Sequence, residues 1–311
     1  MRPNDPQQGA SRQTIQYGTS RKTTAILGVI LAVVFWGGSF IATKVALRDV
    51  SPVTVVWLRF AIGVVILGAG VRLRRQVSLP AGRDLGYFAL LGFLVITFHQ
   101  WLQSTGLITA QATTTAWIVA TTPIFIALLG WLVLRERLRW VQASGILLAT
   151  VGVLLVVTRG DLALLSAGSF GTPGDFLVLV SALNWAVFSI LSRRGLRAFP
   201  ATLMMFYVMG FGWFFTSLLL IAGPGLSEIS HLSLFGWLGI LFLGIFCSGL
   251  AYIFWYDALQ ALPVAQAGAF VYLEPFVTLV IAAIVLGEVV TLVSLIGGGV
   301  ILLGVWMVQR S

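Results

Sequence analysis

Glu274 is the residue of this chain most clearly suited to chemistry, because it is a lone acidic side chain near the middle of a long apolar stretch. It directly precedes Pro275, whose missing N–H leaves a backbone carbonyl one turn earlier without its helical partner. Ionisable groups at membrane depth are costly and usually belong to a proton or ligand pathway. Glu274 could therefore carry a proton or balance a cationic ligand. A protonated carboxyl that only bonds to a neighbouring helix is the alternative, and the sequence leaves both open.

His99 is the second candidate for proton coupling. A histidine at this depth could titrate or donate to a ligand carboxylate, and a neutral ring bonded within the bundle fits equally well. No Asp, Cys or second His stands near it in the sequence, so metal ligation is not expected. Cys247 is the single cysteine, which excludes an intramolecular disulfide. We expect no metal and no cofactor.

Aromatic and polar side chains share helical faces on several apolar stretches, because they recur at spacings of three, four and seven residues. Together these faces predict a solvated pocket for an amphipathic small molecule, with π surfaces and a few hydrogen-bonding groups. For any single hydroxyl, a bond to its own helix is the favoured alternative. The residues expected to line the pocket are Trp36, Ser39, Phe40, His99, Gln103, Trp117, Asn184, Trp185, Tyr252 and Trp255.

Two basic residues also fall within or beside apolar stretches. Arg59 either pairs with Asp49 across a short connection or attracts an anionic group, and the structural role is favoured. Lys44 lies at a helix end, where its charge can reach the membrane surface.

The composition is that of an integral membrane protein. Apolar residues make up 59% of the 311 residues, charged residues only 9%, and the mean hydropathy is +1.00. A soluble domain carries about 25% charged residues. The net charge of +9 lies in short gaps between apolar stretches, which indicates membrane topology and not a nucleic-acid surface.

Ten stretches have the length and apolar character of a membrane-spanning helix, which needs about 20 residues. Residues 1–22 hold no apolar run and predict a disordered tail. The predicted spans cover residues 25–46, 53–71, 84–104, 110–134, 140–158, 175–192, 202–222, 234–257, 264–287 and 291–308.

The chain also repeats itself at an offset of 152 residues. This predicts a duplication, with one five-helix repeat over residues 23–160 and a second over 161–311. Because five is odd, the second repeat must enter the membrane from the opposite side, so the two repeats are inverted, with the working site between them. The matched pairs are Gly92 and Gly244, Leu107 and Leu259, Pro123 and Pro275, Glu136 and Glu288, Gly145 and Gly297, and Gly152 and Gly304.

Several of these pairs carry structural expectations of their own. Pro123 and Pro275 predict bends in the fourth and ninth spans, which serve either as hinges or as static kinks. The paired glycines predict close helix packing within the fold, with a dimer contact as the weaker alternative. For Glu136 and Glu288 a solvated or salt-bridged role is favoured over a gate.

The distribution of basic residues predicts the orientation. Fifteen of the nineteen Lys and Arg residues fall on the side of the N-terminal tail. The positive-inside rule then places both termini in the cytoplasm, in a multi-pass protein of the inner membrane.

Several short motifs resemble the EamA-type family of the drug/metabolite transporter superfamily. The similarity runs over about residues 25–308 and appears twice in register. The residues that carry it are Phe35-Trp36-Gly37-Gly38-Ser39-Phe40, Ser51-Pro52, Trp57-Leu58-Arg59-Phe60, Pro123 with Leu134-Arg135-Glu136, and Leu273-Glu274-Pro275 with Leu286-Gly287-Glu288.

The resemblance implies a secondary transporter, usually an exporter of amino acids, other metabolites or amphipathic drugs and often proton-linked. An importer or a nucleotide-sugar antiporter remains the main alternative, although such anions call for more basic residues than Arg59 and Lys44. A passive channel and a membrane-embedded enzyme are disfavoured, because neither a ring of charges nor a catalytic cluster is present in the sequence. The expected partners are a small-molecule substrate, the lipid bilayer and protons, in a monomer or weak homodimer.

Overall fold

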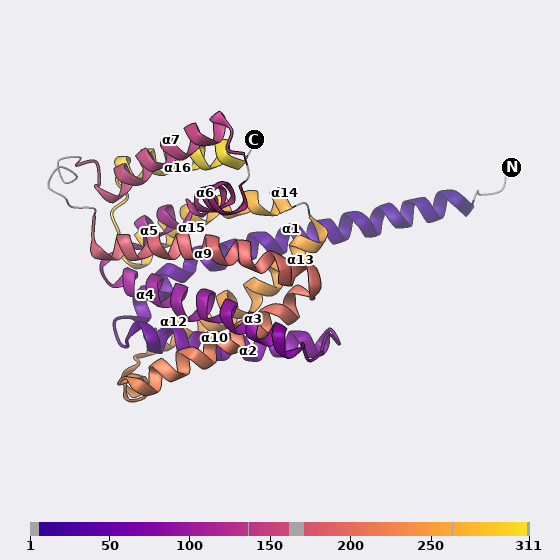
Figure 1. The fold of residues 1–311 in the computed structure, drawn as a ribbon, viewed down its shortest axis with the longest axis horizontal. Helices are drawn as coiled ribbons and strands as arrows, with labels where there is room; N and C mark the ends of the chain where they lie inside the picture. Colours follow the sequence, from indigo (N-terminus) through magenta and orange to yellow (C-terminus); the bar gives the residue numbers. More distant parts are fainter. Residues whose placement is uncertain (1–5, 136, 162–170, 263, 310–311) are drawn as a thin grey trace.

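The computed structural model describes residues 6–135, 137–161, 171–262 and 264–309, and in these ranges it contains helices and no β-strand. Ten helical segments in the described ranges are long and apolar enough to cross a membrane, and each overlaps one predicted span. The all-helical, ten-span prediction is therefore confirmed. Both termini lie at the same end of the helix bundle, as an even number of crossings requires (Figure 1).

Six of the ten spans are single uninterrupted helices. They are α1 (Pro6–Ala46), α2 (Pro52–Leu73), α7 (Trp140–Val157), α9 (Pro173–Ala198), α10 (Ala201–Ala222) and α16 (Leu292–Gln309). Proline stands at the start of α2 and α9, where its missing N–H costs nothing and its fixed φ favours the helix. The N-cap Thr172 and Asp175 form a capping box that fixes the start of α9.

Helix α1 begins within the segment for which the sequence predicts a disordered tail. Its candidate membrane span starts at Lys22, and the helix continues outwards to Pro6. Extending an existing helix costs much less than nucleating one, so a polar segment can continue a long apolar helix. The outer part of α1 stands away from the bundle (Figure 1).

The third and eighth spans are interrupted at matching positions by π-helical turns. The third consists of α3 (Gly82–Gly92), η1 (Phe93–Phe98) and α4 (His99–Thr109). The eighth consists of α12 (Leu234–Leu241), η3 (Phe242–Leu250) and α13 (Ala251–Ala261). π-Helical turns are rare and occur often at functional sites.

The fourth and ninth spans are also broken, and in each the helix resumes one residue before its proline. The fourth consists of α5 (Ala112–Val119) and α6 (Thr122–Leu134). The ninth consists of α14 (Val264–Phe270), the 3-10 turn η4 (Val271–Leu273) and α15 (Glu274–Val285). The interruptions stand where Pro123 and Pro275 remove a backbone donor, as the sequence predicts. Whether these breaks act as hinges stays a prediction. A short connection with α11 (Gly225–Glu228) and the 3-10 turn η2 (Ile229–His231) precedes α12.

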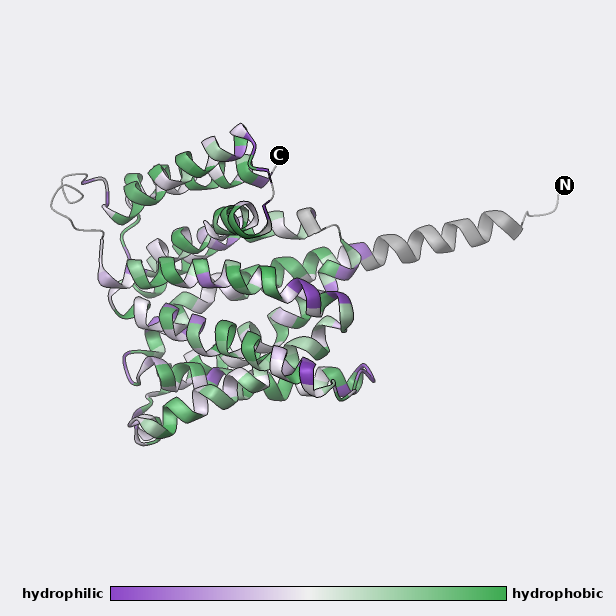
Figure 2. Cartoon of the chain, in the orientation of Figure 1, coloured by the Kyte–Doolittle hydropathy of each residue, from purple (hydrophilic) through white to green (hydrophobic). Residues whose placement is uncertain are grey.

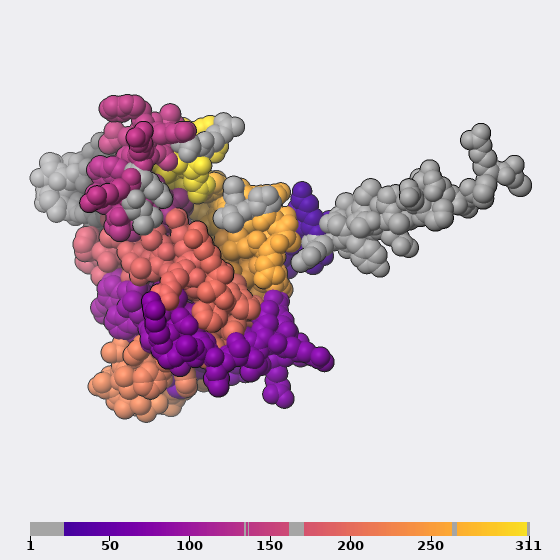
Figure 3. Space-filling model, turned by 45° about the vertical axis from the view of Figure 1, so that its right-hand side comes forward, coloured from indigo at the N-terminus to yellow at the C-terminus, as the bar shows by residue number. Residues whose placement is uncertain are grey.

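Contacts between the first and second sets of five spans come in matched pairs. α7 packs on α16 and α2 on α10, so that equivalent spans meet (Figure 1). α1 packs along η3 and α13, just as α9 packs along η1 and α4. This is the pattern that a two-fold relation between the halves produces, and segments from both halves alternate across one face of the molecule (Figure 3).

The helices of the bundle carry mostly hydrophobic residues, and hydrophilic residues gather towards its two ends (Figure 2). Along the helices, Leu, Ile, Val and Phe side chains such as Val65, Leu147 and Ile284 are exposed. In water such a surface would be strongly unfavourable, whereas lipid tails solvate it. The fold is therefore that of a multi-pass membrane protein.

The α7–α16 interface is held together by glycines. A Cβ atom on Gly145 would lie 2.6 Å from the carbonyl oxygen of Gly304, and one on Gly152 would lie 2.7 Å from that of Gly297. Only glycine allows the two backbones to approach so closely. The expectation that these glycines serve packing within the fold is confirmed.

Candidate functional site

Three of the predicted pocket residues meet between α1 and the eighth span. The ring of Trp36 lies 5.9 Å from that of Tyr252 and 5.5 Å from that of Trp255, measured between ring centroids. The Trp36 indole N–H donates to the carbonyl oxygen of Cys247 at 3.2 Å. That carbonyl belongs to the π-helical turn η3, where i→i+5 hydrogen bonds replace the α-helical pattern.

Three more predicted residues meet between α9 and the third span. The His99 ring lies 5.1 Å from the Trp185 ring, and its Nδ1 donates to the carbonyl oxygen of Ser181 at 2.9 Å. The Asn184 amide donates to the carbonyl oxygen of Leu94 in η1 at 2.8 Å. His99 is buried and hydrogen-bonded within the bundle, which matches the structural alternative for this residue.

These two groups are related by the repeat. Trp36 and Trp185 stand 149 residues apart, each on the first helix of its half, and each faces the third span of the other half. We call the interface that contains Trp36, His99, Trp185, Cys247 and Tyr252 the central seam. It is the place where the sequence predicts the working site.

Glu274 borders the central seam from α15. It is 9% exposed and begins α15 directly after the 3-10 turn η4. Its backbone packs against α1, since a Cβ on Gly37 would lie 3.0 Å from the Glu274 carbonyl oxygen. Thr278 donates to the carbonyl oxygens of both Gly37 and Glu274. Within the described residues, no hydrogen bond or ion pair of the Glu274 carboxyl group is observed, although it lies within electrostatic range of Cys247.

Arg59 was not among the residues predicted to line the pocket, yet it lies in the central seam. It is 5% exposed, and its Nε donates to the Ser248 hydroxyl at 3.0 Å and its Nη1 to the Gln100 amide oxygen at 3.3 Å. Arg59 thus joins η3 of one half to the start of α4 in the other. The signal in the sequence was that Arg59 is a basic residue well inside an apolar stretch.

The expected pairing of Arg59 with Asp49 is wrong. The Asp49 carboxylate accepts from the backbone N–H and the hydroxyl of Ser233 and so caps the start of α12. Asp49 lies in the connection after α1, whereas Arg59 lies two turns inside α2 and points into the bundle. Orphan N–H groups at a helix start attract a carboxylate strongly, which explains the partner that Asp49 takes.

Four other predicted pocket residues do not join the central seam. Trp117 is fully buried among α5, α15 and α16, with its ring against Gly298 and 5.5 Å from the Phe276 ring. Phe40 packs with Leu107 and Ala282 in a separate apolar cluster. The Ser39 hydroxyl donates to its own helix at the Trp36 carbonyl oxygen. Gln103 is half-buried and has no role in the contacts above.

Aromatic rings from both halves contact one another in the central seam, and those of Trp36, Trp185 and Trp255 are half-buried. Two hollows lie away from the central seam, one against Tyr272, Leu302, Leu303 and Trp306 and one against Trp131, Leu138, Trp140 and Ala143. Both are shallow and apolar and face the lipid side. The structure therefore brings six of the predicted pocket-lining residues together at this interface.

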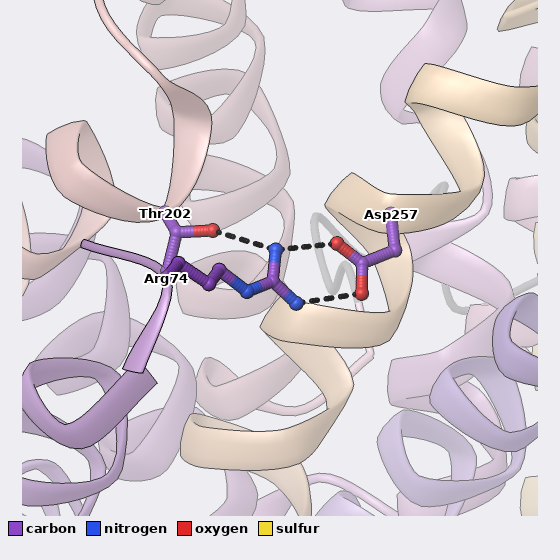
Figure 4. A network of polar contacts seen from close by, with 3 residues as sticks. All are labelled: Arg74, Thr202 and Asp257. Carbon is purple, nitrogen blue, oxygen red and sulfur yellow. Dashed lines mark hydrogen bonds and ion pairs between the residues drawn. The ribbon is translucent and has the colours of Figure 1, made fainter. Parts of the chain in front are cut away.

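Polar contacts close the central seam at the end where the termini lie. The Arg74 guanidinium forms two parallel hydrogen bonds to the Asp257 carboxylate, at 2.6 and 2.7 Å, and a longer one to Thr202 (Figure 4). These residues join α2 to α13 and α10, so the contact spans both halves. The hydrogen bonds to Asp257 outweigh partial burial and raise the pKa of Arg74 above its ordinary value.

Helix caps close the opposite end. The Glu288 carboxylate accepts from the backbone N–H groups of Ala112 and Thr113 at the start of α5, at 2.7 and 3.0 Å. Lys44 donates to the carbonyl oxygen of Ala110 at the end of α4. Glu288 thus links the second half to the first as a helix cap. This contact is neither a fully solvated position nor a salt bridge, and whether it acts as a gate stays a prediction. Its repeat partner Glu136 lies outside the described residues.

Glu228 makes a third cap at this end. Its carboxylate accepts from the Ser51 backbone N–H at 2.9 Å and from the Thr54 hydroxyl at 2.7 Å, at the start of α2. Burial alone would raise the pKa of Glu228, but these hydrogen bonds outweigh it and lower the pKa below the ordinary value.

Comparison with known proteins identifies the family. The model of the EamA-like transporter family matches the chain twice, over residues 23–158 and 172–310. The chain belongs to the EamA-like transporter family. The two matched segments correspond to the two sets of five spans, so the family assignment and the duplication agree.

Curated relatives align with this chain over nearly its whole length. A protein of Archaeoglobus fulgidus described as an uncharacterized transporter is 28% identical over 89% of this chain and 94% of its own. A probable terminal-alkyne amino-acid exporter of Streptantibioticus cattleyicolor is 28% identical over 92% and 93%. A probable amino-acid metabolite efflux pump of Salmonella typhimurium is 26% identical over 89% and 92%.

A solved crystal structure shares the fold of this transporter. The TM-score is 0.62 at 22% sequence identity, over 92% of this chain and 96% of the other. The family and these relatives are transporters and not enzymes. The protein is therefore a membrane transporter for a small-molecule substrate.

Proposed function

We propose that this transporter exports amino acids or related amphipathic metabolites from the cytoplasm by alternating access at the central seam. The observation that carries the proposal is the two-fold-related seam, in which aromatic rings and buried polar groups from both halves meet between polar contacts at the two ends of the bundle. The names of the amino-acid exporter and efflux-pump relatives support the substrate class and the direction.

The two-fold contact pattern suggests how the seam would open. Two halves related in this way have two similar ways to separate, one towards each side of the membrane. Opening towards the termini would break the Arg74–Asp257 pair, and opening the other way would break the Glu288 and Glu228 caps. A solute shifts this equilibrium only by binding one opening better than the other.

Six seam residues are proposed to contact the solute once the seam opens. Their rings can cover an apolar or cationic part, and their amide and imidazole groups can bond a polar part. They are Trp36, His99, Asn184, Trp185, Tyr252 and Trp255.

Glu274 is proposed as the proton-coupling group. Its carboxyl is buried beside the seam with no observed partner, so its charge would be strongly unfavourable in the closed state and tolerable when water enters. A carboxyl that loses its proton in one opening and regains it in the other would link export to the proton gradient. His99 is the weaker candidate, because its Nδ1 is already committed to Ser181.

The proposed orientation follows the positive-inside rule. The end of α2 and the start of α3 lie at the end of the bundle that holds both termini (Figure 1), and Arg72, Arg74, Arg75 and Arg83 belong to this part of the chain. With this end in the cytoplasm of the inner membrane, the Arg74–Asp257 pair closes the cytoplasmic entrance. Because the paired glycines are used between α7 and α16, they offer no free face for a dimer, and a monomer is proposed.

Flux measured in proteoliposomes tests the proposal. Wild-type protein should show saturable counterflow of amino acids, with a rate that depends on an imposed pH gradient. Glu274→Gln should keep counterflow but lose at least about tenfold of the gradient-driven rate, because a glutamine cannot release a proton. Asp84→Asn, which removes one acidic charge from the long 3.7 Å pair with Arg194, is the matched control. Unchanged gradient dependence in Glu274→Gln rules out its coupling role, and flux without saturation rules out a carrier.

A further inference from the structure

We propose that Arg59 is the binding group for the carboxylate of the transported solute. The inference rests on the proposed function, which supplies the class of solute, and it adds the side chain that recognises the solute carboxylate. It also predicts that a solute without a carboxylate, such as an amine or an amide, is a poor ligand.

Arg59 is a buried cation without an acidic partner among the described residues. The ion pairs observed there are Arg74 with Asp257 and, at 3.7 Å, Arg194 with Asp84. The two hydrogen bonds of Arg59 go to the neutral acceptors Ser248 and Gln100, and no partner of its Nη2 group is observed among the described residues. A buried unpaired charge is strongly unfavourable unless an ion or a ligand of opposite charge completes the site.

The geometry holds the guanidinium in place for such a ligand. Gly63, one turn after Arg59, brings α2 close to η3, because a Cβ at this position would lie 2.8 Å from the Ser248 Cβ. The Phe60 ring lies 5.0 Å from the guanidinium carbon and supports it from one side. A guanidinium with fixed Nε and Nη1 presents its remaining donors in one plane, which suits the two oxygens of a carboxylate.

The surroundings also fit an amino acid. The two acceptors of Arg59 lie close in the chain to aromatic groups from both sides of the central seam, because Gln100 directly follows His99 and Ser248 stands one helical turn before Tyr252. Those rings can cover an apolar side chain while the guanidinium holds the carboxylate.

The repeat supports a single anion site. Gly63 and Gly212 are equivalent, since Gly212 packs on Ile96 of η1 as Gly63 packs on Ser248 of η3. The same offset of 149 residues places the buried Val208 opposite Arg59. The second half therefore offers no matching cation, and one carboxylate per protein is expected. Polyanions such as nucleotide sugars would need more positive charge, and Lys44 is held at the end of α4.

A binding experiment on the purified full chain tests this role. The probes are L-leucine, L-methionine and L-phenylalanine, each beside its own amide, which keeps the side chain and amino group but lacks the carboxylate. Equilibrium binding is measured for wild type, Arg59→Gln, Arg59→Lys and the control Arg72→Gln, an exposed arginine on the same helix. Folding is checked for each variant by size-exclusion chromatography and thermal unfolding.

We expect wild type and Arg72→Gln to bind at least one acid at least tenfold more tightly than its amide, which corresponds to about 1.4 kcal/mol. Arg59→Gln should bind acid and amide alike. Arg59→Lys keeps the charge but loses the planar guanidinium, so it should show an intermediate preference for the acid. This variant tests the role of Arg59 if Arg59→Gln does not fold.

Two outcomes overturn the role of Arg59. One is an undiminished preference for the acid in folded Arg59→Gln or Arg59→Lys; the other is a wild type that binds no acid better than its amide. Either result can coexist with pH-dependent export in the flux assay, so it leaves the proposed function standing. Absence of carrier-type flux for any amino acid would instead remove the proposed function.

Discussion

The central seam and the α7–α16 interface both join the two halves, but the residues that form them differ in size and polarity. At the α7–α16 interface, glycines bring backbone against backbone, so a Cβ on Gly304 would lie 2.5 Å from the Gly145 carbonyl oxygen. The central seam instead buries a cation, a carboxyl group, an imidazole and several large rings that touch across the boundary.

The difference indicates which interface stays fixed during transport. Close backbone packing has no second arrangement at similar energy, because sliding or opening would lose many contacts and gain none. Buried polar groups are costly when dry and recover their hydration when water enters. We therefore infer that α7 and α16 form a fixed support, and that the central seam is the part that opens.

The largest expected effect is on the fixed interface. Gly304→Leu should reduce folded yield and lower the unfolding temperature strongly, because the new side chain meets the Gly145 carbonyl and the Ala149 backbone. Overpacking a tight interface costs about 1–3 kcal/mol or more. Gly299→Leu is the matched control, since a Cβ at Gly299 meets nothing within 4 Å. Thermal unfolding in detergent measures both, and equal stability of the two variants would remove the distinction between the interfaces.

An intermediate effect is expected at the Arg74–Asp257 pair, the proposed cytoplasmic closure of the seam. The lone Cys247 is fully buried in the seam, with its Sγ donating to the Phe35 carbonyl oxygen, and so reports opening without added cysteines. Asp257→Asn weakens the charged pair with Arg74, whose partial exposure limits its contribution to about 1 kcal/mol or less. Labelling of Cys247 by a membrane-impermeant maleimide from the side of the termini should become severalfold faster.

The control for this experiment is Arg72→Gln, which alters an exposed charge on the same helix. The labelling rate of this variant should match that of wild type. If Asp257→Asn leaves the rate unchanged, or speeds labelling from the opposite side only, the pair does not close the cytoplasmic entrance.

The smallest expected effect concerns acid sensitivity at the other end. The pKa of Glu228 is lowered in the folded state, so its contribution to stability is complete above the ordinary value of 4.5 and is lost as the pH falls through the lower folded value. Because Glu228 is only half-buried and solvent screens its charge, this contribution should stay below about 1 kcal/mol.

Unfolding temperatures of wild type and Glu228→Gln between pH 7 and pH 3 check the sign. Glu228→Gln should be slightly less stable than wild type at pH 7, and the gap should close at pH 3. A gap that widens in acid would show that the carboxylate is not stabilised by the start of α2.

Much of the architecture was predictable because it depends on local chemistry. Twenty apolar residues must form a helix in lipid, where no water satisfies the backbone, so the spans follow from composition. Pro123 and Pro275 marked the broken spans because a proline removes a donor wherever it stands. The duplication was visible because glycines and prolines recur at a fixed offset.

The sequence by itself determined the ten helices, their pairing into two matched sets and the residues on each helical face. Only the tertiary structure decided which faces meet. In it Trp117 packs against α16, Asp49 accepts a hydrogen bond from Ser233, and Arg59 donates to Ser248 and Gln100. The physical reason is that helical periodicity fixes a side chain's direction relative to its own axis. The rotation and neighbours of that axis depend on packing throughout the bundle, as does the closure of the seam.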